Sequence, residues 1–466
     1  MKLLLTFLAA LCAGLASAAA ADKPNVLLLI ADDMNCALGT YGHPLAKTPA
    51  LDRLAGSGVR FDRAYCQFPL CNPSRASLLS GRWPATTKVL DNNTRANVAL
   101  QPFKLLPQTF REHGYRTARI GKILHHGMDI PTLWDKAEEA SMKDNTERQF
   151  QRKAADALGK QRLGQKTDAA SEHFLWAKSP GAEEDFGDAQ KAGKAIEWLE
   201  EFAKEEKPFF LAVGFLKPHH PYVAPAKYFE HYPLDKISWA QEPPDHLKEI
   251  PPIALTAAAG SREMTEARRR EIIAAYLACI SLVDAQAGRV LDTLDRLKLA
   301  GKTIVLFLGD HGYHLGEHGT LWHKLSLFDE SARAPLIIRA PGKAANGKPC
   351  ARPVQFLDLY PTLAALCGLP TPPELDGHDL SPLLDNPAAP WPHAAFSFVA
   401  HGRTRNGAAV STERYRYIEW QNGAAGAQLY DSQSDPHELK NLAKDPQHTA
   451  TVAELKKLLS RIPKPY

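Results

Sequence analysis

The chain has 466 residues, of which 44% are hydrophobic and 23% are charged, and its formal net charge is +4 at pH 7. This length can bury a core large enough for one big α/β domain and a smaller one, and the composition is that of an ordinary globular protein. The weak positive charge, without a run of Lys and Arg, argues against nucleic acid as a partner.

Residues 1–21 predict a cleaved signal peptide. Lys2 precedes an apolar stretch too short to span a bilayer, and small residues follow at 16–21. Cys12 would permit a lipoprotein, but Leu11 stands where a lipobox has a small residue. We therefore expect a periplasmic or secreted protein with no membrane anchor after cleavage. A catalytic domain at 22–384 and a C-terminal subdomain at 385–466 would follow.

Six cysteines remain beyond this segment, and their scattered positions in a long chain lead us to predict no disulfide. They are Cys36, Cys66, Cys71, Cys279, Cys350 and Cys367.

The first predicted strand is the apolar run 26–31, which reads as a strand buried on both faces of a parallel sheet. Asp32 and Asp33 follow it directly, at the strand end where α/β sheets bind ligands. Adjacent acids can belong to a solvated turn. After so apolar a strand, however, a hard cation such as Ca²⁺ or Mg²⁺ between them is favoured.

A helix at 48–55 and a strand at 59–64 lead to the string Leu-Cys-Asn-Pro-Ser-Arg-Ala-Ser-Leu-Leu-Ser-Gly-Arg at 70–82. Pro73 predicts a helix start there, which places Cys71 and Arg75 beside free backbone N–H groups that attract anions. The guanidinium of Arg75 suits a tetrahedral oxyanion. A lone Cys would be interpreted as a small core residue, so this one needs partners elsewhere in the chain.

A helix at 106–114, stopped by its glycine, and a strand at 115–121 precede Lys122 and His125, which by themselves could be solvated loop residues. The stretch 129–185 loses periodicity and predicts loops and short helices. A helix at 189–204 and a buried strand at 208–215 then lead to Lys-Pro-His-His-Pro-Tyr at 217–222. There His219, at a strand end between prolines, is a candidate general acid, with His220 beside it.

A long helix at 266–297 and a buried strand at 303–309 precede Asp310 and His311, which would complement the first acid pair as metal ligands. Lys324 lies further along the chain and could point its ammonium at the anion expected beside Cys71 and Arg75. A strand at 334–340 and a helix at 354–369 complete this part. Short alternating strands at 395–399, 407–412, 415–420 and 428–430, with a helix at 449–461, predict a small antiparallel sheet.

These elements predict an α/β fold: a large, mixed, mostly parallel central sheet flanked by helices, followed by the small antiparallel sheet with its terminal helix. The string at 70–82 resembles the signature of type I sulfatases, in which the cysteine is oxidised to formylglycine. The strings Gly-Lys-x-x-His at 121–125 and Gly-Asp-His-Gly at 309–312 match the same family. The resemblance covers nearly all of the chain after the signal peptide and implies the alkaline-phosphatase-like fold.

Within that family the chain is most similar to iduronate-2-sulfatases and their bacterial relatives, through Gly-Lys-Ile-Leu-His, Lys-Pro-His-His-Pro and Leu-Gly-Glu-His-Gly. This implies an exo-acting enzyme that removes the 2-O-sulfate of a terminal uronate in a glycosaminoglycan. Two departures lie near the expected pocket: Tyr313 replaces a tryptophan, and the segment before Lys324 is one residue longer. The sulfated sugar itself stays open.

The resemblance also implies the residue roles. Asp32, Asp33, Asp310 and His311 would hold Ca²⁺, with Mg²⁺ possible, and the modified Cys71 would complete the sphere. Arg75, Lys122 and Lys324 would bind the sulfate oxygens. His219, with Lys324, would protonate the departing alcohol, and His125 would accept the proton that expels sulfate. The substrate-binding candidates are Lys122, His219, Lys324, His220, Tyr313 and His323, and His314 is a further candidate for a uronate carboxylate.

The implied partners are a sulfated carbohydrate and a formylglycine-generating maturation enzyme. Three alternatives remain open. The chain could be a phosphonate or phosphodiester hydrolase of the same superfamily, or a sulfatase for choline sulfate or an algal polysaccharide. The third alternative is a non-catalytic glycan-binding protein, which the complete set of expected catalytic residues disfavours.

Overall fold

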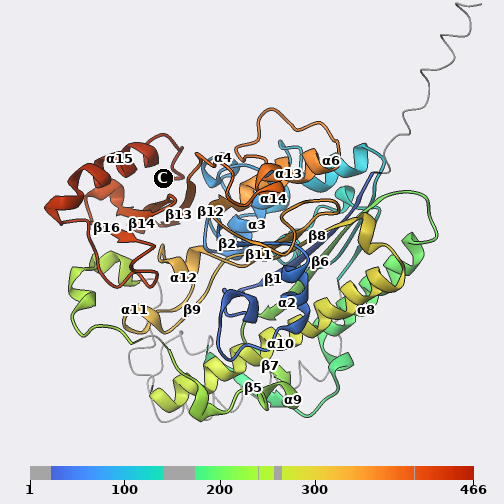
Figure 1. The fold of residues 1–466 in the computed structure, drawn as a ribbon, viewed down its shortest axis with the longest axis horizontal. Helices are drawn as coiled ribbons and strands as arrows, with labels where there is room; N and C mark the ends of the chain where they lie inside the picture. Colours follow the sequence, from blue (N-terminus) through green and yellow to red (C-terminus); the bar gives the residue numbers. More distant parts are fainter. Residues whose placement is uncertain (1–22, 140–173, 240, 257–264, 403–404) are drawn as a thin grey trace, which may run out of the picture.

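The computed structural model describes residues 23–139, 174–239, 241–256, 265–402 and 405–466 (Figure 1). The predicted signal peptide at 1–21 and most of the irregular stretch at 129–185 lie outside the described residues. In the described part, the cysteines after residue 22 are all free, with Cys36 half-buried and the others buried.

The centre of the molecule is an eight-stranded sheet, in which β11 alone runs antiparallel to both of its neighbours in the described chain. Its strands, in spatial order, are β12 (Pro349–Gln355), β2 (Val59–Tyr65), β11 (Leu336–Arg339), β8 (Thr303–Gly309), β1 (Asn25–Asp32), β6 (Phe209–Pro218), β3 (Arg116–Gly121) and β4 (Lys136–Glu138). The fully buried β1 pairs in parallel with β6 and β8, for example through Leu28 opposite Ala212 and Leu306. This confirms the predicted large, mixed, mostly parallel sheet.

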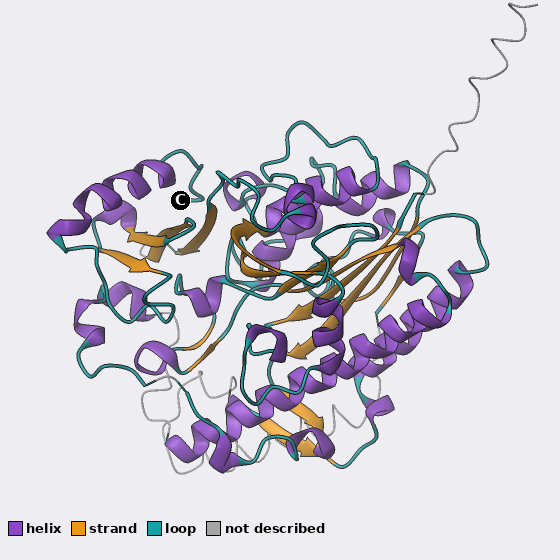
Figure 2. Ribbon diagram, in the orientation of Figure 1, coloured by secondary structure: helices purple, strands orange, loops and turns teal. Residues whose placement is uncertain are grey.

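Helices cover both faces of the sheet (Figure 2). Alternate side chains of β1 point to opposite sides, so each face of the sheet carries apolar side chains that pack against helices. Leu27 and Leu29 belong to one core with α2 (Pro49–Gly56), α8 (Gly187–Phe202) and α10 (Glu266–Arg296). Val26 and Leu28 belong to a second core on the other face. That core includes α3 (Cys71–Ser80), α6 (Leu106–Glu112), α13 (Leu359–Leu366) and α14 (Ser381–Asp385). The predicted helices at 48–55, 106–114, 189–204 and 266–297 agree with these bounds to within two residues.

Helix α10 is the one described helix long and apolar enough to cross a membrane by length and composition. However, 89% of its apolar window is buried inside the protein. It packs against α8, β6 and β7 (Tyr222–Pro225), so its apolar character is that of a core helix.

The C-terminal region forms the predicted antiparallel sheet, in the order β13 (Ala395–His401), β14 (Arg405–Ser411), β15 (Tyr415–Trp420) and β16 (Ala427–Asp431). Helix α15 (Thr449–Leu459) follows it, and in Figure 1 this red region lies beside the end of the central sheet that carries β12. Phe396 and Phe398 of β13 pack edge-on against Trp83 of the large domain, so the two regions share a core.

Several elements differ from the predicted ones. The prediction of a single helix at 354–369 is wrong. Val354 and Gln355 end β12, and a short 3-10 helix (Phe356–Asp358) precedes α13. β12 was not predicted as a strand because it contains two prolines. The strand tolerates them because it lies at the edge of the sheet. The stretch 129–185, predicted as loops and short helices, supplies the edge strand β4 and also β5 (Trp176–Ser179), which pairs with β7.

The remaining short elements lie in the connections. They are α4 (Pro84–Thr87), α5 (Ala96–Ala99), α9 (Ala226–Phe229), β9 (His314–Leu315), α11 (Glu317–Thr320), β10 (Trp322–His323) and α12 (Asp329–Ala332).

Candidate active site

The predicted site residues meet at the carboxyl edge of the central sheet, because β3, β6, β1 and β8 run parallel and end there. Asp33 adopts a left-handed backbone (φ 62°), which turns the chain directly after β1. Its N–H donates to the Asp310 Oδ1 at 3.0 Å, across from β8. A hydrogen bond from a backbone N–H to a side-chain carboxylate thus joins the two acid-bearing strand ends, and the structure brings Asp32, Asp33, Asp310 and His311 together.

Cys71 is the first residue of α3, which begins at the extended Leu70. Pro73 therefore occupies the third helical position, still within the turn whose N–H groups lack helical partners. The Cys71 Sγ lies 3.1 Å from the Lys324 Nζ, 3.5 Å from the His311 Nε2 and 3.7 Å from the Asp33 Oδ1. In a matured enzyme this sulfur would be replaced by the oxygen of formylglycine. The cysteine is thus at the centre of the cluster.

The Cys71 thiol is itself a poor nucleophile in this setting. Burial and the charge of Asp32 raise its pKa to about 12, although Lys122 and Lys324 oppose the shift. Because the thiolate is the reactive form of cysteine, an unmodified Cys71 would be inert at neutral pH. The environment agrees with a role for the residue after modification.

Three cations neutralise three buried carboxylates around Cys71. The Arg75 Nε donates to the Asp310 Oδ2 at 2.8 Å, Lys122 pairs with Asp32 at 2.5 Å, and Lys324 pairs with Asp33. Burial alone would raise the pKa of Asp32, but Lys122 and the neighbouring positive groups hold it well below its usual range. Lys324 has the same effect on the buried Asp33. Asp32 and Asp33 are therefore ionised at neutral pH.

The donor set fits a hard divalent cation. Ligand atoms of Asp32, Cys71, Asp310 and His311 lie within 4.8 Å of one another, and all four residues are buried. The Asp33 Oδ2 is buried without a hydrogen-bond partner, which leaves it available as a ligand. The ring of His311 hydrogen-bonds through its Nδ1 to the Gly312 carbonyl at 2.8 Å, so its Nε2 presents a lone pair to the cluster.

His219 and His125 flank this cluster on adjacent strand ends. The Nδ1 of His219 hydrogen-bonds to the His220 carbonyl at 2.7 Å, and its Nε2 lies 3.8 Å from the Asp33 Oδ2. Burial lowers the pKa of His219, although the nearby carboxylates oppose the shift. Burial and Lys122 lower the pKa of His125 to about 4, and its Nδ1 is buried without a partner. His125 is therefore neutral at pH 7 and able to accept a proton.

Four of the substrate-binding candidates, His219, His220, His323 and Tyr313, form a row of rings beside the cluster. His220 stacks on His219 with ring centroids 4.3 Å apart and lies 6.0 Å from His323. Tyr313 packs edge-on against His323, but it is fully buried and its hydroxyl accepts a hydrogen bond from Tyr222 at 2.9 Å. In this arrangement Tyr313 supports the position of His323.

His314 does not join this row. It is fully buried, its Nε2 lies 2.6 Å from the Ser326 Oγ, and its Nδ1 lies 3.4 Å from the Glu317 Oε2. The expectation that His314 contributes to carboxylate binding is therefore wrong for this arrangement. Its role is to fix the segment that leads from β9 to Lys324.

Two residues near the site were missed by the sequence analysis. Tyr276 of α10 donates to the Asp33 carbonyl at 2.7 Å and accepts from the Asn35 N–H at 2.9 Å, which fixes the turn after β1. Its signal was a hydroxyl on an otherwise apolar helix face. Arg405 of β14 donates to the carbonyl oxygen of Leu325, the residue after Lys324. No local pattern in the sequence announced that contact.

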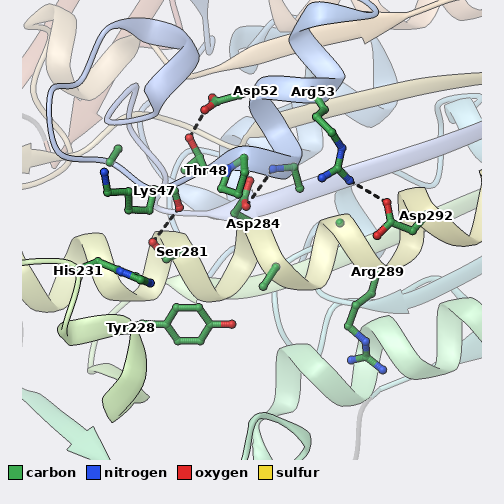
Figure 3. A pocket seen from close by; sticks show the side chains of 15 residues that line it. Lys47, Thr48, Asp52, Arg53, Tyr228, His231, Ser281, Asp284, Arg289 and Asp292 are labelled. Carbon is green, nitrogen blue, oxygen red and sulfur yellow. Dashed lines mark hydrogen bonds and ion pairs between the residues drawn. The ribbon is translucent and has the colours of Figure 1, made fainter.

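A separate cavity of about 730 Å³ lies between α2, α9 and α10 (Figure 3). None of the predicted site residues lines it. Asp284 lies at its wall and accepts hydrogen bonds from the N–H groups of Ala50 and Leu51 at the start of α2. Burial raises the pKa of Asp284 to about 7. This acid has a structural explanation as a helix cap.

Comparisons with known proteins agree with this geometry. Residues 24–369 match the family model described as Sulfatase, and residues 316–464 match that described as N-sulphoglucosamine sulphohydrolase, C-terminal. The chain is 35% identical to an iduronate 2-sulfatase of Mus musculus, covering 78% of this chain and 73% of the relative. It is 34% identical to a sulfatase of Formosa agariphila, covering 94% and 87%.

Among solved structures, a phosphonate monoester hydrolase of Agrobacterium radiobacter superposes with a TM-score of 0.74 at 26% identity. That superposition covers 94% of this chain and 95% of the other. The family model, the two sulfatase relatives and the fold support one assignment. The chain belongs to the sulfatase family of the alkaline-phosphatase-like superfamily and is a sulfuric ester hydrolase.

Proposed function

We propose that this protein hydrolyses sulfate esters of carbohydrates, with the 2-O-sulfate of a terminal uronate as its substrate, through a formylglycine made from Cys71. The observation that carries the proposal is the contact of Cys71 with Lys324 and His311 inside a buried cluster of ionised carboxylates. The chemistry needs this set: a nucleophile, cations for the sulfate oxygens, and ligands for a hard cation.

The cation site is assigned to Asp32, Asp33, Asp310 and His311, with residue 71 beside them, and Ca²⁺ is favoured over Mg²⁺. When bound, the cation would favour the ionised form of one hydroxyl of the hydrated aldehyde. The protein's own charges prepare for this, since its three carboxylates and three cations balance. A divalent cation, a monoanionic sulfate ester and one ionised hydroxyl would then leave the site neutral.

Arg75, Lys122 and Lys324 are assigned to the sulfate oxygens. Arg75 is held in place by Asp310 and by the Lys122 and Ile123 carbonyls, so its orientation is set before substrate arrives. The pKa of Lys122 and that of Lys324 are raised by nearby carboxylates against the effect of burial, so both stay charged. Preorganised cations of this kind stabilise charge that grows on the sulfate in the transition state.

Proton transfer is assigned to two histidines. The hydroxyl oxygen at residue 71 would form the new S–O bond while the S–O bond to the sugar breaks. The departing alcohol would receive its proton from Lys324, which stays charged, together with the protonated form of His219, which burial makes the minor form. The neutral His125 would take the proton from the second hydroxyl, so that the C–O bond to sulfate breaks and the aldehyde is restored.

The substrate assignment rests on similarity and on charge. The relative from Mus musculus is an iduronate 2-sulfatase, and the rim of this site carries His220 and His323. The structural similarity to a phosphonate monoester hydrolase makes phosphonate or phosphodiester hydrolysis the second candidate. We also propose export to the periplasm or medium, on the basis of residues 1–21, and maturation by a formylglycine-generating enzyme.

The test is a comparison of initial rates of the matured protein on five substrates. They are a 2-O-sulfated unsaturated uronate disaccharide, 6-O-sulfated glucosamine, choline sulfate, p-nitrophenyl sulfate and a phosphate diester. We expect the first to have the highest kcat/KM. A kcat/KM more than about 10-fold higher for 6-O-sulfated glucosamine or for choline sulfate would refute the uronate assignment, since this ratio equals about 1.4 kcal/mol of transition-state discrimination. A preference for the phosphate diester would refute the sulfatase proposal.

A further inference from the structure

Arg405 is a largely buried guanidinium for which the described residues supply no carboxylate. Its Nε is buried and has no hydrogen-bond partner, and burial lowers its pKa to about 10. Its interactions with described residues are a hydrogen bond to the Leu325 carbonyl and a cation–π contact with Trp420 at 5.9 Å. Burying a charge without a counter-charge is unfavourable, so this arrangement needs an explanation.

The other buried arginine of the same small sheet shows the ordinary solution. Arg416 of β15 is fully buried and pairs with Glu438 at 2.7 Å. Arg75 of α3 likewise pairs with Asp310 and Asp32. Arg405 therefore differs from Arg416 and Arg75 in having no carboxylate partner among the described residues, and not only in how deeply its side chain is buried.

Its position relates it to the candidate active site. The Leu325 carbonyl, which Arg405 contacts, directly follows Lys324, and the Lys324 Nζ lies 3.1 Å from the Cys71 Sγ. The Leu325 N–H donates to the Pro69 carbonyl at 3.1 Å, two residues before Cys71. Arg405 thus reaches from the C-terminal sheet to the backbone that carries both the candidate nucleophile and the candidate lysine.

We propose that Arg405 binds a second anionic group of the sulfated substrate, a carboxylate or another sulfate, beside the sulfate that is cleaved. The proposal rests on the proposed sulfatase function. The positive charge around Cys71 is already balanced by Asp32, Asp33 and Asp310, so it has none to spare for a second anion. Arg405 supplies that charge, and its planar fork matches carboxylate and sulfate oxygens.

This makes the C-terminal sheet part of substrate selection. A substrate with one negative charge would leave Arg405 without a counter-charge, whereas a substrate with two would pair with it. The selection would act on binding, since the second anion is present in both the substrate and the transition state.

The experiment measures kcat and KM for wild type, Arg405→Gln and Arg405→Lys on matched substrates. One pair is the 2-O-sulfated unsaturated uronate disaccharide and its carboxyl-reduced form; the other is 6-O-sulfated glucosamine with and without an N-sulfate. The glutamine keeps a donor for the Leu325 carbonyl but removes the charge. We expect Arg405→Gln to lower kcat/KM for the two-anion member of at least one pair by roughly 10- to 100-fold, mainly through KM. The single-anion members and p-nitrophenyl sulfate should change less than about 3-fold.

Arg405→Lys should retain part of the preference, and Arg414→Gln is the matched control. Arg414 is an exposed arginine of the same sheet region that pairs with Asp431. An equal loss on all substrates would show that Arg405 only positions Lys324, and no loss on any would show a purely structural role; either result overturns the proposal. Wild-type turnover of p-nitrophenyl sulfate tests the sulfatase function separately, and thermal unfolding midpoints check that each variant is folded.

Discussion

Two buried aspartates, Asp33 at the strand ends and Asp284 beneath α2, show what separates an acid of the candidate site from a structural one. Both side chains are almost inaccessible to solvent. Asp33 lies in the turn directly after β1, and Asp284 lies next to the N–H groups at the start of α2. Burial pushes both pKa values upward, but Lys324 and its positive neighbours reverse the shift at Asp33. At Asp284 burial outweighs the N–H groups of α2 and the nearby Arg53, so its pKa stays raised to about 7. Burial alone therefore does not identify a site; the fixed cations around Asp33 are what separate it from Asp284.

The largest expected effect comes from removing the proposed nucleophile at residue 71, at the centre of the Asp33 cluster. Cys71→Ala should lower kcat by at least about 10⁴-fold, because the remaining groups can bind sulfate but cannot attack it. The fold should survive, since the change removes one buried atom and no charge. The measurement is sulfate release together with the thermal midpoint. Wild-type turnover by a folded Cys71→Ala protein would end the proposed mechanism.

Removing the charge of one acid sharpens the comparison directly. Asp33→Asn should lower activity by at least about 100-fold and reduce bound calcium or magnesium, because it removes a ligand and leaves Lys324 unpaired. Asp284→Asn is the matched control and should keep both activity and metal. Elemental analysis and initial rates distinguish the two. Stoichiometric zinc without calcium or magnesium would contradict the hard-cation assignment.

The proposed proton donor should show its role through the leaving group. His219→Ala should lower the rate on a sugar sulfate by roughly 10²- to 10⁴-fold. The loss on p-nitrophenyl sulfate should be much smaller, because nitrophenolate leaves without a proton. His231→Ala, in the cavity of Figure 3, is the control. Equal losses on the two substrates would assign His219 to binding instead.

The last expected effect lies at Asp284 and concerns stability and not activity. Its pKa is raised from 3.8 to about 7, so the folded state holds a proton that the unfolded state has released between these values. Wild-type stability should therefore fall relative to Asp284→Asn as the pH rises from about 4 to about 7, by up to about 4 kcal/mol. Urea unfolding of both proteins at several pH values measures the difference. A constant difference across this range would show that Asp284 does not titrate there.

The central part of the fold was predictable because its signals are local. Apolar runs such as 26–31 and 303–309 identified buried strands, and the polar residues after them had to meet at one edge of a parallel sheet. The edge strand β12 was not predicted because its prolines are typical of loops. The strands β9 and β10 at 314–323 were not predicted because they have only two residues each.

The site was predictable as far as its residues belong to strand ends and to motifs. Tyr276 and Arg405 were not, because each acts through a contact more than 75 residues away in sequence. The burial of His314 depended on its hydrogen-bond partner Ser326, which no spacing rule connects to it. Tertiary contacts of this kind decide which polar residues face a substrate and which only support the loops.

The most direct test of the whole account is peptide mass spectrometry of residue 71 in preparations that contain different amounts of formylglycine. Expression with and without a formylglycine-generating enzyme supplies the series, and sulfate release from a sulfated uronate disaccharide is measured on each. The account predicts activity proportional to the fraction of formylglycine and none in fully unmodified protein, whose buried Cys71 thiol has a raised pKa. Full activity of a preparation with unmodified cysteine at position 71 would contradict it.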